Sequence, residues 1–210
     1  MTLTIFGATG MVGRRLVEHA LYEGHTIMAF GRNVYTSDFK ENEKLHLIQG
    51  ALFDEQQVYD AILRSDAVLS ALGGAFDGTD KTRSLGMKNI VMQMQKAGVK
   101  RIIAIGGKGI LDSRDGGLIM EEPMYPRQFI PVGIEHFKAY ELLKASTLKW
   151  TFIGAPDLVD GPATGTFFTA ADGIPSPDKN KININDLALF MLDELRKNEY
   201  VGHRVGISNG

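Results

Sequence analysis

The sequence predicts an α/β protein with a doubly wound parallel sheet. Strand and helix patterns alternate along its 210 residues, and a glycine-rich turn follows the first strand, where such a fold starts its first helix. Alternation of this kind implies right-handed crossovers and helices on both faces of the sheet. Two long connections, 106–131 and 154–181, follow strand ends and are expected to form a small substrate region.

The first strand, helix and strand are the clearest elements. Residues 3–6 form an apolar run typical of a strand, 14–21 have helical periodicity that Gly24 can end, and 26–30 predict a second strand. Later strands are expected at 45–49, 67–70, 101–105, 150–153 and 204–207, and later helices at 55–64, 81–97, 134–145 and 185–197. No internal repeat or linker divides them, so we expect one domain, 1–210.

The turn after the first strand has the spacing of a phosphate-binding loop. Three glycines let the chain turn sharply, bring bare backbone against a pyrophosphate and pack the next helix close to the sheet. The phosphates would lie on free N–H groups at the helix N-terminus. The alternative is a turn without a ligand. The predicted contacts are Gly7, Thr9, Gly10, Met11, Val12 and Gly13.

Arg32 and Asn33 follow the second strand, where NAD-binding sites usually carry an acidic residue for the ribose 2′-hydroxyl. An arginine there can pair with a 2′-phosphate instead. The sequence therefore favours NADPH over NADH, with NADH as the alternative. The other interpretation of Arg32 is a solvated charge at a strand end.

Small residues at two further strand ends are candidate cofactor contacts. Leu72 and Gly73 follow the fourth strand, and Gly106 and Gly107 follow the fifth, near the expected nicotinamide position. The alternative for these glycines is turn geometry alone.

Composition narrows the class of protein. The net charge of −2 and a pI near 6.2 give no general attraction for nucleic acid or an anionic membrane. We expect neither as a partner, and we expect a cytoplasmic protein, because no apolar stretch has the length of a membrane span and the chain opens on a strand instead of a signal peptide. With no cysteine and five scattered histidines, we expect no metal site.

The chain resembles the atypical short-chain dehydrogenase/reductases, which have an NAD(P)-binding Rossmann fold. Within that family it looks most similar to the branch of the B-type biliverdin reductase, also called NADPH-flavin reductase, with its bacterial NADH-flavin reductase relatives. The resemblance rests on Gly7-Ala8-Thr9-Gly10 with Gly13, on Arg32, on Leu72-Gly73, and on motifs within 143–151, 156–165, 184–187 and 199–203.

The resemblance implies hydride transfer from NADPH to a planar acceptor such as a flavin or a quinone. It aligns His136 with a pocket histidine, which we interpret as a substrate contact or proton source, the alternative being a structural helix histidine. Two pocket positions depart from the family: an expected serine falls on Gly107, and an expected histidine falls on Asp157. After the third strand, Ala51 replaces a common acidic residue, and Asp54 comes three residues later. The long connections also carry apolar side chains that could wall a ring-binding pocket. We predict that Met124, Tyr125, Asp157 and Phe167 line it.

Two other functions stay open at this point. The missing polar groups allow a non-catalytic NADP(H)-sensing protein that resembles the NmrA-like regulators. A nucleotide-sugar epimerase or dehydratase is less favoured, because Tyr140 and Lys144 have the Tyr-x-x-x-Lys spacing but lie out of register for catalysis. We expect a monomer or a homodimer.

Overall fold

The computed structural model describes residues 1–209. Its strands are β1 (Thr2–Phe6), β2 (Thr26–Gly31), β3 (Leu45–Gln49), β4 (Ala67–Ser70), β5 (Arg101–Gly107), β6 (Lys149–Ala155), β7 (Asp157–Val159), β8 (Phe167–Ala171), β9 (Lys181–Asn183) and β10 (His203–Asn209). Its α-helices are α1 (Met11–Tyr22), α2 (Glu55–Ile62), α3 (Thr82–Ala97), α4 (Ile130–Lys144) and α5 (Ile184–Lys197). Short 3-10 helices are η1 (Val34–Thr36), η2 (Lys108–Ile110), η3 (Ile119–Glu121) and η4 (Arg127–Phe129).

Eight strands form the main sheet, in the order β3-β2-β1-β4-β5-β6-β10-β8. The chain builds β2 and β3 on one side of β1 and then crosses to β4 on the other side, which creates a switch point between β1 and β4. This order defines a Rossmann fold. Ligands of such sheets bind beyond the carboxyl ends of the strands at the switch point.

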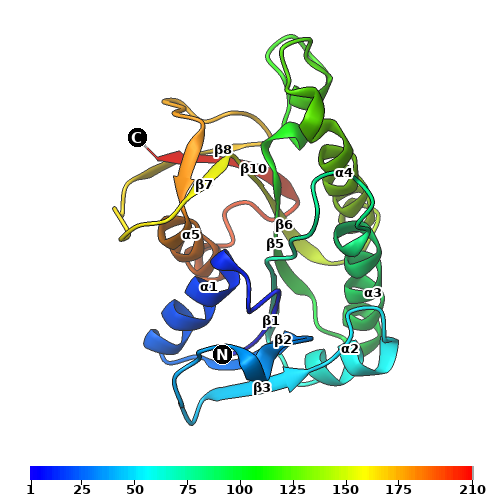
Figure 1. Cartoon of the computed structure of the whole chain (residues 1–210), viewed down its shortest axis with the longest axis vertical. Coiled ribbons are helices and arrows are strands. Elements are labelled where there is room, and N and C mark those ends of the chain that lie inside the picture. Colours follow the sequence, from blue (N-terminus) through cyan, green and yellow to red (C-terminus); the bar gives the residue numbers. More distant parts are fainter. Residues whose placement is uncertain (210) are drawn as a thin grey trace.

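Helices cover both faces of the sheet, as Figure 1 shows: α1 and α5 lie on one side, and α2, α3 and α4 on the other. The alternation of side chains along β1 explains the two layers. Leu3 and Ile5 pack with α1 and α5, whereas Phe6 packs in the opposite layer with residues of α2, α3 and α4. All three side chains are fully buried.

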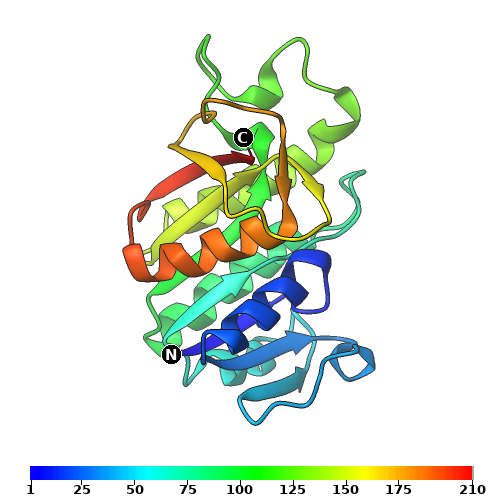
Figure 2. The same cartoon turned by 90° about the vertical axis from the view of Figure 1, so that its left-hand side faces the viewer.

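The main sheet is mostly parallel, as predicted for a doubly wound fold, and one edge strand departs from that direction. β8 runs antiparallel to β10, while the other neighbouring strands of the main sheet are parallel. The second long connection also contains β7, which pairs with β9 at the end of that connection in a small separate sheet (Figure 2). These strands are short and carry no clear alternation, so the sequence pattern did not indicate them.

Helix ends differ from the predictions by a few residues. α1 begins at Met11, directly after the glycine turn, and α4 begins at Ile130 with Pro131 in its first turn. Proline is well suited to that position because the first N–H groups of a helix have no partner within the helix. The early start of α4 brings its first turn toward the strand ends. Within residues 1–209, no helix combines the length and apolar character needed to cross a bilayer.

Candidate functional site

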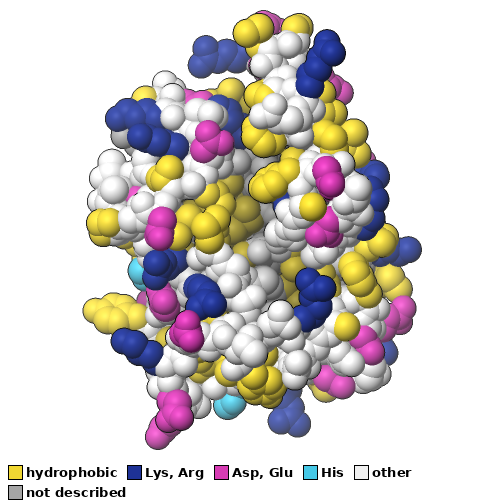
Figure 3. Space-filling model, in the orientation of Figure 1, with side chains coloured by type: hydrophobic (Ala, Val, Ile, Leu, Met, Phe, Trp, Pro, Cys, Tyr) yellow, Lys and Arg dark blue, Asp and Glu magenta, His cyan; other side chains and the backbone are white. Residues whose placement is uncertain are grey.

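A cavity of about 1020 Å³ opens at the carboxyl ends of the strands, over the switch point. Its walls come from the β1–α1 turn, the ends of β2, β4 and β5, the start of α4 and both long connections. Figure 3 shows this side of the molecule hollowed near its centre, with hydrophobic side chains gathered around the hollow. The volume is at the upper end of the range for ligand pockets.

The β1–α1 turn has the geometry of an anion-binding loop. Gly7 has φ +76°, and a side chain there would also collide with the carbonyl of Ala71. A side chain at Gly13 would collide with the carbonyl of Gly7, so that glycine lets α1 approach the turn. Gly10, directly before α1, provides no side-chain cap, and no acidic residue lies in the first turn of the helix. The free N–H groups of α1 therefore face the cavity as a site for phosphate.

Arg32 lies at the end of β2 on the rim of the same cavity. Its side chain is exposed and forms no ion pair with any residue of 1–209, while its carbonyl accepts a hydrogen bond from Gln49 Nε2 at 3.0 Å. Asp54, the nearest acidic residue after β3, caps α2 by accepting from Gln57 N and does not line the cavity. A free guanidinium without a competing carboxylate suits a 2′-phosphate.

The glycines after β4 and β5 differ in their surroundings. Gly73 lines the cavity with no atom near its missing side chain, so a ligand can approach its backbone. At Gly107, by contrast, a Cβ atom would lie 2.7 Å from Nδ1 of His136. Gly107 thus makes room for the imidazole, which explains why a larger residue is absent at this position.

His136 lies on α4 and faces the cavity. Burial, followed by the positive charge of Arg83, lowers its pKa to about 3, although Glu135 opposes the shift. The imidazole is therefore neutral at physiological pH. A neutral imidazole can donate or accept a hydrogen bond, so this pKa favours the substrate-contact interpretation of His136 over the proton-source interpretation near pH 7.

Glu135, next to His136, joins α3 to α4. Its carboxylate is buried and accepts hydrogen bonds from the Ser84 hydroxyl, from Lys81 Nζ at 3.2 Å and from Lys138 Nζ at 3.0 Å. Desolvation opposes its ionisation, but these hydrogen bonds prevail and lower its pKa. The network fixes the helix turn that carries His136.

Arg83 and Phe76 build a wall that the sequence did not reveal. The guanidinium of Arg83 donates to the carbonyls of Gly74 and Ala75, each at 3.0 Å, and lies 5.6 Å from the ring centre of Phe76. Phe76 in turn meets Phe129 edge to face at 6.3 Å. Both rings line the cavity, and Phe76 is 61% exposed. Phe129 belongs to the first long connection, where apolar pocket residues were expected, whereas Phe76 comes from a connection without a recognisable motif, which is why sequence patterns missed it.

Of the predicted acceptor residues, three line the cavity and one does not. Met124, Tyr125 and Asp157 lie on its wall. The prediction for Phe167 is wrong, because its ring packs against Phe190 of α5 at 5.9 Å, on the far side of β10. Phe167 is the first residue of β8, and its side chain packs against the core instead of lining the cavity.

Two predicted cofactor contacts also lie outside the cavity wall. Gly13 acts through helix packing, as described above, and Asn33 accepts hydrogen bonds from Thr36 and Ser37 with its carbonyl. The other ten predicted contacts all line the cavity. They are Gly7, Thr9, Gly10, Met11, Val12, Arg32, Leu72, Gly73, Gly106 and Gly107.

Tyr140 and Lys144 do not form a catalytic pair in this cavity. Tyr140 is 7% exposed and packs edge to face against Trp150 at 5.7 Å. Lys144 Nζ lies 5.6 Å from the centre of the tyrosine ring, and neither residue lines the cavity. This confirms that the Tyr-x-x-x-Lys spacing is out of register.

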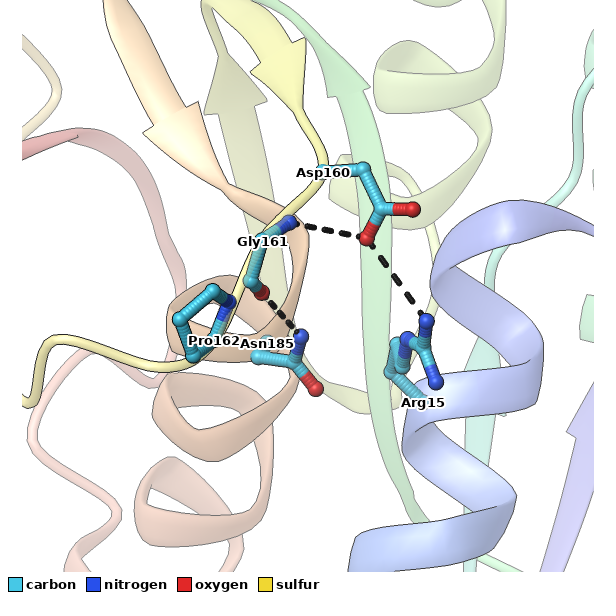
Figure 4. Close-up of a pocket in the computed structure, with 5 residues that line it drawn as sticks. All are labelled: Arg15, Asp160, Gly161, Pro162 and Asn185. Carbon is cyan, nitrogen blue, oxygen red and sulfur yellow. Dashed lines mark hydrogen bonds and ion pairs between the residues drawn. The ribbon is translucent and has the colours of Figure 1, made fainter.

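A second hollow lies between α1 and α5 (Figure 4). Its polar groups already satisfy one another: Arg15 lies 3.6 Å from Asp160, Asp160 accepts from Gly161 N, and Asn185 Nδ2 donates to the carbonyl of Gly161. Few groups remain for a ligand. We therefore assign binding to the larger cavity.

The chain belongs to the NAD(P)H-binding family, whose model matches residues 7–198. It is 28% identical over 160 residues to the bifunctional pinoresinol-lariciresinol reductase 2 of Thuja plicata, in a match that covers 72% of this chain and 48% of that enzyme. The chain spans about half the length of the curated reductases from Thuja plicata that it matches.

Two solved structures resemble nearly the whole chain. A putative NADH-flavin reductase from Streptococcus pneumoniae TIGR4 has a TM-score of 0.86 and 26% identity, with complete coverage of both chains. A putative epimerase from Bacteroides thetaiotaomicron has a TM-score of 0.87 and 28% identity, with 99% of this chain and 96% of that chain covered. These findings confirm an NAD(P)H-binding oxidoreductase family with a Rossmann fold.

Proposed function

We propose that this protein is an NADPH-dependent reductase of a flavin, a quinone or a similar conjugated acceptor. The observation that carries the proposal is the continuity of one cavity. It extends from the anion-binding turn and Arg32 to His136 and the pair Phe76 and Phe129. The Streptococcus pneumoniae neighbour, named as a putative NADH-flavin reductase, supports the same class of reaction.

The nucleotide half of the cavity fits NADPH. Uncapped N–H groups at the start of α1 suit the pyrophosphate, and Arg32 has no ion-pair partner among residues 1–209 and so can pair with the 2′-phosphate. When bound, NADPH would supply a hydride to the acceptor. Leu72 and Gly73 would support the part of the cofactor nearer the strand ends.

The acceptor half fits a planar ring. Phe76, Phe129 and Met124 give this end of the cavity an apolar surface on which a conjugated ring can stack. The neutral imidazole of His136 orients the acceptor through a hydrogen bond, while water supplies the proton that completes reduction. Alignment and stacking provide most of what hydride transfer requires.

Turnover of NADPH with a panel of acceptors tests the proposal. The purified protein is mixed with NADPH and, in turn, FMN, riboflavin and menadione, and the absorbance of the reduced nicotinamide is followed. We expect oxidation of NADPH that depends on the acceptor. Absence of oxidation with all three acceptors would contradict the proposal.

One observation favours a second function, that of a non-catalytic NADP(H) sensor. The cavity offers no side chain at Gly107 and no protonated imidazole at neutral pH, so its acid chemistry is poor. Binding of NADPH without turnover, together with a change in affinity for a partner protein, would support this function. An epimerase is disfavoured by the buried position of Tyr140.

A further inference from the structure

We infer that the hydroxyl of Tyr125 forms a binding site for a carbonyl oxygen of the acceptor. The inference rests on the proposed function, because it names the chemical group that the acceptor must present. It narrows the acceptor class to conjugated carbonyl compounds, such as quinones and isoalloxazines, and excludes planar hydrocarbons.

Gly109 provides the space for this hydroxyl, and Gly133 borders it. A Cβ atom at Gly109, just after β5, would lie 2.7 Å from Tyr125 Oη, and one at Gly133, on α4, would lie 3.9 Å from it. The tyrosine ring therefore reaches across from the 106–131 connection to the gap between the end of β5 and α4. Glycine at position 109 lets the hydroxyl approach this deeply, and Gly133 lies at ordinary contact distance beside it.

The hydroxyl is placed beside the imidazole of the site. Gly133 and His136 are three residues apart on α4 and so share a face of the helix. His136 lies against Gly107, and Tyr125 Oη lies against Gly109, two residues further along the same chain segment. Both side chains also line the cavity, so the phenol and the imidazole lie at the same end of it.

This hydroxyl has no partner within residues 1–209. None of the side-chain hydrogen bonds in that range involves Tyr125 Oη, although the backbone N–H of Tyr125 donates to Glu122 O at 3.0 Å. Tyr125 is half-buried, and its hydroxyl is absent from the fully enclosed polar atoms that lack a partner, so it keeps an accessible surface. A phenol that is held in place and reachable is a donor for a ligand.

Desolvation raises the pKa of Tyr125, so the phenol keeps its proton at neutral and moderately alkaline pH. When bound, NADPH would supply two electrons and one proton as a hydride to the acceptor ring and would itself become oxidised. Negative charge then collects on the acceptor carbonyl oxygen, where the O–H of Tyr125 donates a hydrogen bond. A proton from water neutralises that oxygen, and Tyr125 ends the reaction unchanged.

Paired ligands test the inference by binding, independently of turnover. Menadione carries two carbonyl groups, and 2-methylnaphthalene has the same ring system without them. Dissociation constants of both are measured by titration calorimetry for the wild type and for Tyr125→Phe. We expect the substitution to raise the dissociation constant of menadione about tenfold, the size expected for one lost hydrogen bond. The dissociation constant of 2-methylnaphthalene should change by less than about twofold.

A second variant distinguishes loss of the hydroxyl contact from loss of binding through unfolding. Gly109→Ala would place a methyl group against Tyr125 Oη and displace the ring while leaving the hydroxyl in the chain. We expect it to weaken the binding of menadione as much as Tyr125→Phe does. Thermal melting curves of both variants show whether they fold.

The outcomes separate this inference from the proposed function. If the wild type oxidises NADPH with menadione, and both variants bind menadione as tightly as the wild type, the inference about Tyr125 is wrong and the proposed function stands. Selective loss of menadione binding in the variants supports the inference even if NADPH turnover fails. Failure of the wild type to bind menadione overturns the inference outright.

Discussion

The nucleotide half and the acceptor half of the cavity differ in the atoms that form them. In the nucleotide half, backbone atoms make the site: the turn at Gly7, the helix start at Gly10 and the strand end at Gly73. In the acceptor half, side chains make it, including Phe76 and Tyr125 from connections that follow β4 and β5. Backbone sites depend on the fold, whereas side-chain sites can change within it. The comparison explains how one fold serves many reactions.

The largest effect is expected in the nucleotide half, at Gly7. Gly7→Ala combines an unfavourable φ with a collision against the carbonyl of Ala71, so we expect a loss of about 3 kcal/mol in the free energy of unfolding. NADPH binding should be lost with it. Urea denaturation and NADPH titration measure the two effects.

Gly98→Ala is the matched control for that prediction. Gly98 has nearly the same φ, +75°, but no atom lies near its missing side chain. We expect a loss of about 1 kcal/mol there, from backbone conformation alone, and normal NADPH binding. Equal losses at Gly7 and Gly98 would show that the close contact in the turn contributes nothing.

Arg32 is the one side chain on which the nucleotide half should depend strongly. Arg32→Gln is expected to weaken NADPH binding about 10-fold to 100-fold, as for loss of charged hydrogen bonds. Binding of NADH should change by less than about twofold. Arg15→Gln, in the hollow between α1 and α5 and away from the large cavity, serves as control. An equal loss of affinity for NADPH and NADH would show that Arg32 does not contact the 2′-phosphate.

These two predictions concern the part of the molecule that the sequence described best. The glycine spacing and the position of Arg32 are local signals, so they could be interpreted without the tertiary structure. The wall formed by Phe76 and Phe129 depends on two connections about fifty residues apart meeting in space. No local pattern encodes that meeting. Phe167 shows the converse, since an aromatic residue in a long connection begins the edge strand β8 and packs against Phe190 of α5.

His136 links the acceptor half to stability. Its folded pKa of about 3 lies below the ordinary value of 6.5, so the unfolded chain binds the proton more tightly. The stabilising contribution is complete above pH 6.5 and declines as pH falls from 6.5 toward 3. At pH 5 the loss should be about 2 kcal/mol relative to pH 7.5.

His136→Gln tests this linkage, because glutamine does not titrate. Urea denaturation at pH 7.5 and pH 5.0 should show a smaller decline for the variant than for the wild type, by about 2 kcal/mol. His46→Gln, at an exposed position on β3, should retain the wild-type decline. An unchanged decline in His136→Gln would mean that the imidazole is solvated in the folded protein.

The smallest effect is expected at the aromatic wall. Phe76→Ala removes one ring of the pair and should raise the KM for menadione about fivefold, which corresponds to about 1 kcal/mol. The dissociation constant of NADPH should not change. Tyr22→Ala, at a residue 92% exposed on α1, provides the control. If Phe76→Ala impairs NADPH binding instead, the division of the cavity into two halves is misplaced.

A comparison of NADPH and NADH binding tests the central claim most directly. The wild-type protein is titrated with each reduced nucleotide, and binding is followed by quenching of the fluorescence of Trp150, which lies in the core on β6, with calorimetry as the second readout. We predict that NADPH binds at least about tenfold more tightly, because Arg32 contributes charged hydrogen bonds only to the 2′-phosphate. Equal affinities, or no binding of either nucleotide, would contradict the account.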